Sequence, residues 1–248
     1  CGAQVDFVDI DPETGLMSVE ALQHKLKQAH KAGTLPKVLV PVHLCGTSCD
    51  MEAIGALAKS YGVSIVEDAS HAIGGRFKGE PVGNCRHSSV TVFSFHPVKI
   101  ITTAEGGMAT TNDPQLAQRM TDLRSHGITK EEARFERPAP GSWSYEQQDL
   151  GFNYRLTDLQ AALGLSQLER LEVIVAERQR LLEVYRQQLA PLPVSLLEIP
   201  ADVRSALHLA VIRLDNPDPE HHRRVFEGLR SAGIGVQLHY SPVHLQPY

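Results

Sequence analysis

The chain has 248 residues, of which 42% are hydrophobic and 21% are charged, a balance typical of a globular protein with a substantial core. Its formal net charge of −5 leaves no basic surplus, which argues against attraction of the whole protein to nucleic acid or anionic lipid. No apolar run approaches the roughly 20 residues of a membrane-spanning helix, so we expect a soluble protein without a membrane partner.

The four cysteines are too few for a disulfide scaffold, and their spacing matches no zinc-binding pattern. We therefore expect reduced, structural thiols, no metal site and a cytoplasmic location. The chain begins at Cys1, without a methionine, and ends at Tyr248 within an apolar, proline-rich phrase. These ends predict a segment of a longer protein, truncated on both sides.

The first half of the chain alternates predicted strands with predicted helices. The strands are expected at residues 5–10, 37–43, 63–67, 89–95 and 107–111, and the helices after Ser18 and at residues 51–61. The stretch 37–43 is apolar on both faces, which is typical of an interior parallel strand. This alternation predicts an α/β fold with a mostly parallel, doubly wound sheet, in which ligands bind beyond the carboxyl ends of the strands.

The second half is predicted to leave this sheet. Residues 128–150 are polar and rich in proline, so we expect a long surface loop. Leucines at helical spacing predict a long, bent helix from Leu156 to about Leu189, which would bridge two domains. The tail predicts a smaller α+β domain, with a strand at 207–214, a helix at 219–231 and a strand at 235–240.

Asp68 directly follows the predicted strand 63–67. A carboxylate at the end of a buried strand costs desolvation energy unless another group pairs with it. One interpretation is that Asp68 caps the turn that leads to Gly74 and Gly75. The other is that it belongs to a ligand site.

Ser94 and Lys99 lie at the end of the predicted strand 89–95 and in the turn that follows it. The lysine is surrounded by Val98, Ile100 and Ile101, and poor solvation lowers the pKa of an amine. Such a lysine suits a nucleophile that forms a Schiff base, whereas the alternative is a lysine that extends to the surface.

Together, Asp68 and Lys99 are the pair that a pyridoxal 5'-phosphate (PLP) site requires. The amine holds the aldehyde of the cofactor, and the carboxylate keeps the pyridine nitrogen protonated so that the ring can withdraw electrons. Ser94 would donate a hydrogen bond to the phosphate. The sequence therefore predicts PLP as the cofactor.

Five motifs, in order along the whole chain, resemble those of the DegT/DnrJ/EryC1/StrS family of PLP-dependent sugar aminotransferases. They are Asp68-Ala-Ser-His71, Ser94-Phe-His-Pro-Val-Lys99-Ile-Ile-Thr-Thr-Ala-Glu-Gly-Gly107, Arg124-Ser-His-Gly127, Gly151-Phe-Asn-Tyr-Arg-Leu-Thr-Asp158 and His239-Tyr-Ser-Pro-Val-His-Leu-Gln-Pro247. Within the family, the residues of these motifs are most similar to those of the pseudaminic acid branch. The family's upstream Gly-Thr-Ser/Ala phosphate loop is missing, and Cys45 and Thr47 stand where relatives often have other small or polar residues.

The resemblance implies a fold-type I transferase. Residues 1–155 would be part of the large PLP-binding domain, 156–190 the connecting helix, and 191–248 part of the small C-terminal domain.

The resemblance also implies roles for individual residues. Lys99 would bind the cofactor as a Schiff base and then carry the proton between substrate and cofactor, and Asp68 would face the pyridine nitrogen. His71, where many relatives have glutamine, would lie near the ring hydroxyl, and Ser94 would contact the phosphate.

Asn153 would reach the phosphate of the partner subunit's cofactor, which implies a homodimer with shared active sites. From the residues alone, Asn153 could instead only cap the helix from Leu156. Arg155, His239 and Tyr240 would lie towards the substrate.

The implied activity is transfer of an amino group, expected from glutamate, to a UDP-linked 4-keto-6-deoxy sugar in pseudaminic acid or surface glycan biosynthesis. Two alternatives remain open. The acceptor could be another nucleotide keto-sugar, such as a 4-keto-pentose or a 3-keto-hexose, or the chain could be a non-catalytic, ligand-binding fragment of the fold.

Overall fold

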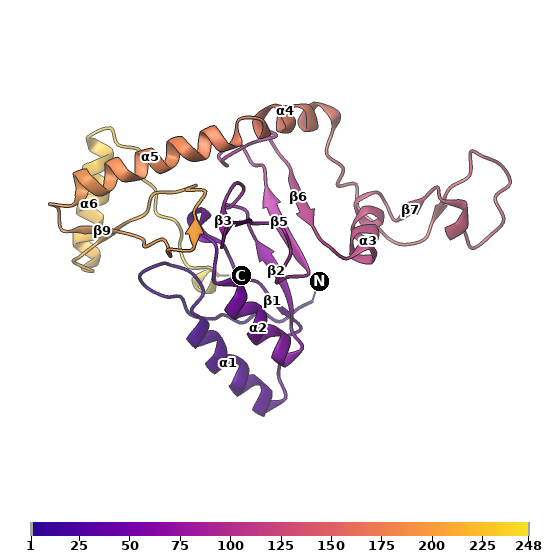
Figure 1. Cartoon of the computed structure of the whole chain (residues 1–248), viewed down its shortest axis with the longest axis horizontal. Coiled ribbons are helices and arrows are strands. Elements are labelled where there is room, and N and C mark those ends of the chain that lie inside the picture. The colour runs from indigo at the N-terminus through magenta and orange to yellow at the C-terminus, as the bar shows by residue number, and fades with distance from the viewer. Residues whose placement is uncertain (1, 248) are drawn as a thin grey trace.

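The computed structural model describes residues 2–247 and is organised around a four-stranded sheet with the order β1–β2–β5–β6 (Figure 1). The strands are β1 (Val38–Leu39), β2 (Ser64–Asp68), β5 (Val90–Ser94) and β6 (Gly107–Thr110). β1, β2 and β5 are parallel, and β6 runs antiparallel to β5. The predicted mostly parallel α/β sheet is confirmed.

Helices α1 (Val19–Ala32) and α2 (Met51–Tyr61) lie together beside β1 and β2 (Figure 1). Each begins at a side-chain cap, in which Ser18 or Asp50 accepts a hydrogen bond from the first turn. Their apolar faces form one core with the sheet, and its side chains are at most 3% exposed at Leu22, Leu26, Ile54, Ala58 and Ile65. The helical spacing seen in the sequence is therefore the spacing of buried residues.

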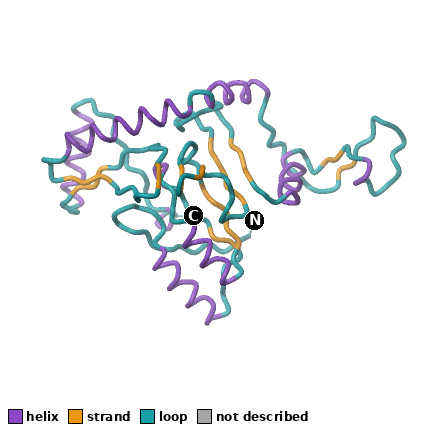
Figure 2. Tube along the Cα trace, viewed as in Figure 1, coloured by secondary structure: helices purple, strands orange, loops and turns teal. Residues whose placement is uncertain are grey.

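Helices α4 (Asp158–Leu168) and α5 (Leu171–Leu189) run as a long rod along one side of the molecule (Figures 1 and 2). Thr157 caps α4 through a reciprocal capping box with Gln160. The chain leaves the helical path between Leu168 and Leu171, so the predicted bend is confirmed. Val175 of α5 is fully buried in a second core with Phe95 and Ile101.

The remaining elements form smaller units around this frame. The strands are β3 (Arg76–Phe77) and β4 (Glu80–Pro81), which form a sheet with β10 (Val203–Arg204), and the antiparallel pairs β9 (Val194–Leu196) with β11 (Ile212–Leu214) and β7 (Ile128–Thr129) with β8 (Glu146–Gln147). The helices are α3 (Pro114–Arg124) and α6 (Pro219–Ser231). The 3-10 turns of the described chain are η1 (Leu44–Gly46), η2 (Glu132–Arg134) and η3 (Val243–Leu245). The predicted loop 128–150 thus contains a short two-stranded ribbon, which extends away from the body in Figure 1.

Three predicted strands need correction. Residues 5–10 and 235–240 form no strand in the described chain, because neither stretch has a neighbouring strand to pair with beyond a single bridge between Ile10 and Met17. Of the predicted strand 207–214, only Ile212–Leu214 pairs.

The expected interior position of residues 37–43 is also wrong. β1 is the edge strand of its sheet, and Val38, Val40 and Val42 are 48%, 47% and 42% exposed. Apolar residues on both faces of a strand therefore do not fix the number of its neighbours, and here the face that carries the three valines is partly exposed.

The C-terminal half joins the sheet through a backbone contact at Gly46. The amide of Ala206 donates to the carbonyl oxygen of Gly46, and the amide of His208 donates to that of Cys45, both at 2.8 Å. A Cβ atom on residue 46 would lie 2.7 Å from the backbone nitrogen of Leu207. Only glycine allows this approach.

A buried polar network holds the ends of β1 and β2 together. The Glu67 carboxylate, 5% exposed, accepts hydrogen bonds from His43 Nε2 at 2.7 Å, from Thr91 Oγ1 at 3.0 Å and from the Ser88 hydroxyl. Burial raises the pKa of Glu67, but these hydrogen bonds outweigh it, and the pKa lies below its ordinary value. Glu67 is therefore ionised and fully used in holding the fold.

Glu67→Gln should destabilise the protein at neutral pH by about 1–3 kcal/mol, because the amide cannot accept all three donors. The pKa of Glu67 is lower in the folded than in the unfolded protein. The carboxylate therefore contributes fully to the free energy of unfolding above its ordinary pKa of 4.5, and this contribution is lost as the pH falls through the folded-state pKa. Urea unfolding of the wild type and of Glu67→Gln across this pH range measures the difference in free energy of unfolding, which should become smaller in acid. A constant difference would contradict the network.

Candidate active site

The carboxyl ends of β2 and β5 bring Asp68 and Lys99 to the same edge of the sheet. β2 ends at Asp68, β5 ends at Ser94, and the two strands are parallel neighbours. In the turn that follows β5, Ile100 and Ile101 are 5% and 3% exposed. These two side chains anchor the turn in the second core and fix the position of the half-buried Lys99 beside them.

The amine of Lys99 has no ion-pair partner within residues 2–247. Burial lowers its pKa below the ordinary value of 10.5, and the charge of Asp68 opposes this shift only in part. An amine of this kind loses its proton more readily than one in water. This favours the nucleophile over a lysine that extends into solvent.

Asp68 fills the first of the two roles that the sequence allowed, the cap, and leaves an oxygen free for the second. Its Oδ1 accepts a hydrogen bond from the amide of Ser70 at 3.0 Å, which is the expected cap of the turn. Its Oδ2 accepts none from another residue in the described range. Backbone bonds to Pro41 and His43, both at 2.9 Å, fix the position of the residue. One carboxylate oxygen is therefore left for a ligand.

His71 is a neutral hydrogen-bond donor. The backbone amide of Cys45, which can only donate, points at His71 Nδ1 at 3.3 Å, so we assign the ring proton to Nε2. Burial lowers the pKa of His71 to about 4, and the charge of Lys99 contributes to the shift. The sequence did not fix this tautomer, but the Cys45 amide does.

The sequence analysis missed His208. Its ring lies against that of His71, with centroids 4.4 Å apart and planes at 41°, and it is only 8% exposed. The only signal in the sequence is a histidine inside the apolar run 206–211.

The C-terminal tail returns to this cluster. His239 lowers the pKa values of both His71 and His208, next to the larger effects of burial and Lys99. The rings of His239 and Tyr240 lie 4.2 Å apart, and both residues are exposed. The charge of His239 is therefore close enough to influence the cluster, and Tyr240 is its neighbour in the chain.

The remaining predicted residues lie differently. Ser94 is half-buried at the end of β5, and its Oγ accepts a weak hydrogen bond from His96 at 3.4 Å. Asn153 and Arg155 are exposed in the segment before α4, and none of the hydrogen bonds or ion pairs within residues 2–247 joins them to Lys99. Because Thr157 caps α4, the alternative that Asn153 caps this helix is wrong.

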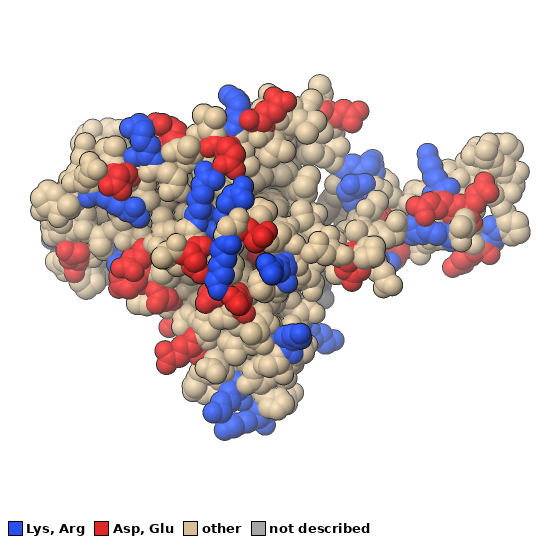
Figure 3. Space-filling model, viewed as in Figure 1, with Lys and Arg blue, Asp and Glu red and all other residues tan. Residues whose placement is uncertain are grey.

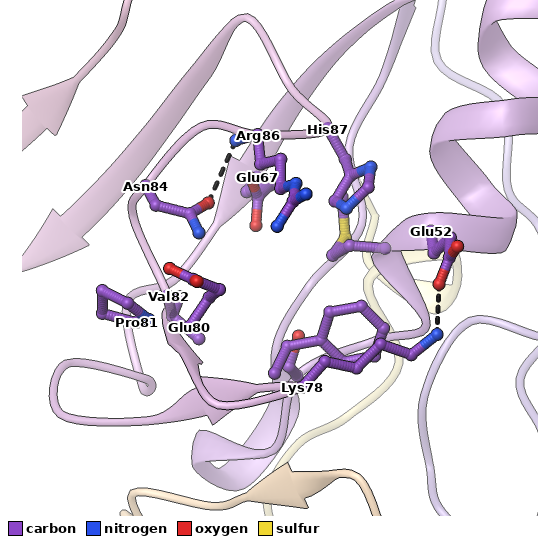
Figure 4. A pocket seen from close by; sticks show the side chains of 12 residues that line it. Glu52, Glu67, Lys78, Glu80, Pro81, Val82, Asn84, Arg86 and His87 are labelled. Carbon is purple, nitrogen blue, oxygen red and sulfur yellow. Dashed lines mark hydrogen bonds and ion pairs between the residues drawn. The ribbon is translucent and has the colours of Figure 1, made fainter.

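A separate cavity of about 250 Å³ lies between the start of α2 and the β3–β4 hairpin (Figure 4). Glu67 lines it, whereas Asp68, His71 and Lys99 do not. Since successive residues of a strand point to opposite faces, this cavity and the Asp68–Lys99 cluster lie on opposite faces of β2. The cavity is not the predicted site.

The face of the molecule seen in Figure 3 shows no dominant charge. Figure 3 shows acidic and basic side chains interspersed over the visible face. Cys45, Cys49 and Cys85 are buried and unpaired, whereas Cys1 is outside the described residues. Residues 2–247 contain no group of three or more side chains placed to hold a metal ion. In the same range, no helix is both long and apolar enough to cross a membrane.

Comparisons with known proteins show the family of the chain. The model of the DegT/DnrJ/EryC1/StrS aminotransferase family matches residues 1–248. MJ1066 of Methanocaldococcus jannaschii is 34% identical over 244 residues, which are 98% of this chain and 61% of that protein.

Two solved structures share the fold closely. Helicobacter pylori PseC, an aminotransferase involved in the biosynthesis of pseudoaminic acid, is 30% identical, with a TM-score of 0.88 over 99% of this chain and 62% of its own. Streptococcus pneumoniae Spr1654 in its PLP-form is 29% identical, with a TM-score of 0.84 over 99% and 64%. The chain therefore spans less than two thirds of the length of these relatives.

Proposed function

Because the chain belongs to the DegT/DnrJ/EryC1/StrS aminotransferase family, we propose that the protein is a PLP-dependent aminotransferase that binds its cofactor through Lys99. The observation that carries the proposal is the meeting of three unused groups at one edge of the sheet. They are the unpaired amine of Lys99, the free Oδ2 of Asp68 and the Nε2–H of His71.

These three groups fit the chemistry of PLP. The amine of Lys99 can form a Schiff base with the aldehyde of PLP, and the carboxylate of Asp68 can pair with the protonated ring nitrogen. The N–H of His71 can donate a hydrogen bond to the ring hydroxyl. When bound, the cofactor supplies an electron sink that stabilises negative charge at the substrate carbon.

The residues of the chain then have distinct tasks. Lys99, with its lowered pKa, can both release and accept a proton at Nζ and so serves as the acid and base at the substrate carbon. Asp68 would hold a proton at the ring nitrogen through its free oxygen, and His71 would orient the ring through Nε2–H. The Ser94 hydroxyl would donate to the phosphate.

For the substrates, we propose a UDP-linked 4-keto-6-deoxy sugar as acceptor and glutamate as donor, in pseudaminic acid or surface glycan biosynthesis. The likeness to PseC and the branch-specific phrasing of the sequence support this choice. His239, Tyr240 and Arg155 would contact the substrate. The unpaired amine of Lys99 speaks against a non-catalytic fragment, whereas another nucleotide keto-sugar remains an outcome of the test.

We also propose a homodimer in which Asn153 completes the partner subunit's site. Asn153 is exposed, does not cap α4 and makes no hydrogen bond to Asp68, His71 or Lys99 in the described chain. Around it Leu150, Phe152, Tyr154 and Leu159 are between 54% and 86% exposed, an apolar surface that a second subunit would bury. We further propose the domain division expected from the sequence, with boundaries after residues 155 and 190.

Lys99→Ala should lower the rate of amino transfer by several orders of magnitude, because the covalent anchor and the proton carrier are lost together.

Asp68→Asn should lower turnover far more than cofactor affinity, since the amide keeps the shape of the side chain but no longer favours the protonated ring. The assay follows amine formation from glutamate and a panel of UDP-keto-sugars. Lys27→Ala, at an exposed lysine, is the control. Near-normal turnover of Lys99→Ala would refute the assignment.

Mixing Asn153→Ala subunits with Lys99→Ala subunits tests the shared site. One site of the mixed dimer would carry both defects and the other neither, so activity should rise above that of both weak parents. Subunit exchange is verified by native mass spectrometry. Exchange without recovery would mean that each site is built within a single chain.

A further inference from the structure

His208 is a buried group for which the proposed activity has no task. Its ring contacts that of His71, its side chain is almost completely enclosed, and its Nδ1 has no partner in the described chain. A buried polar atom without a hydrogen bond is unfavourable, and such positions are retained where another gain offsets the cost.

The backbone of Cys45 places both imidazoles. Its amide donates to the ring of His71 at 3.3 Å, and its carbonyl oxygen accepts from the amide of His208 at 2.8 Å. On the far side, Arg178 Nη1 of α5 donates to the carbonyl oxygens of Leu207 and His208 at 2.9 and 3.2 Å. The His208 ring is therefore held at a fixed place relative to His71, between the η1 turn and α5.

The charges around the pair keep both rings neutral. Lys99 after β5, Arg178 of α5 and His239 of the tail all disfavour a proton on His208, and Asp68 of β2 favours a proton on His71. Burial is the largest cause, and the pKa of His208 is lowered to about 3. His208 therefore presents a flat, uncharged face to His71 at neutral pH.

We propose that His208 is a positioning residue, whose ring packs against His71 and holds its Nε2–H as a hydrogen-bond donor towards the ring hydroxyl of PLP. The inference rests on the proposed function, because it assumes that PLP binds at Lys99. The Cys45 amide fixes the tautomer of His71, and the His208 ring fixes the plane in which Nε2–H points.

A packing role predicts different results for two substitutions. His208→Phe keeps a flat ring of similar size and removes the unpartnered nitrogen, so it should behave like the wild type. His208→Ala leaves space beside His71 and frees its ring. If a nitrogen of His208 contacts the ligand directly, both substitutions should be equally harmful.

The test follows the visible absorption of PLP bound to the full-length protein as a function of pH. A donor at the ring hydroxyl stabilises its deprotonated form, so losing the donor should raise the pH midpoint of the absorption change. For His208→Ala we expect a rise of about one pH unit and about tenfold weaker PLP binding, the equivalent of one hydrogen bond. His208→Phe and the control His87→Ala, at a histidine of the separate cavity, should keep the wild-type midpoint.

A double-mutant cycle shows whether His208 acts through His71. In a His71→Phe background, His208→Ala should add no further shift of the midpoint. An unshifted His208→Ala, an equally shifted His208→Phe or additive shifts in the cycle would overturn the inference alone. A wild-type protein without a visible band would overturn the proposed function and the inference with it.

Discussion

The close approach of Gly46 to residues 205–208 is the contact on which the site depends. Because residue 46 has no side chain, the C-terminal segment can bond to the backbone carbonyls of Cys45 and Gly46. The same turn directs the Cys45 amide at His71. Together with the pairing of β3 and β10, this backbone contact joins the two halves of the chain, and the Cys45 amide places the ring proton of His71 on Nε2.

Successive side chains of β2 point to opposite faces of the sheet, so that one face carries the structural network and the other the candidate site. Glu67 points to one face, where His43, Thr91 and Ser88 use its carboxylate fully, and the next residue, Asp68, points to the other face with an oxygen free. The buried network behind Asp68 holds the ends of β1 and β2 in place. Asp68 is therefore positioned by a strand, and Lys99 by the turn after β5 that the buried Ile100 and Ile101 anchor.

Local signals explain what the sequence could predict. Caps and apolar spacing predicted α1 and α2. The carboxylate and the lysine at the ends of two predicted strands indicated the site. Each of these signals is contained in a short stretch of sequence. The motifs indicated the family, which the comparison with the family model confirmed.

Long-range pairing explains what the sequence could not predict. Residues 5–10 and 235–240 have strand-like composition but no adjacent strand, and a strand exists only with a partner. The role of Cys45 lies in its backbone, which no residue type reveals. His208 reaches His71 only because Gly46 admits the distant segment that carries it.

Reduction of the PLP-loaded protein with borohydride, followed by peptide mapping, tests the central claim most directly. Borohydride fixes a Schiff-base cofactor to the lysine that holds it, so the mass of the label should appear on Lys99 and on no other lysine. The visible band should disappear at the same time. A label on a different lysine, or spread over several lysines, would contradict the account.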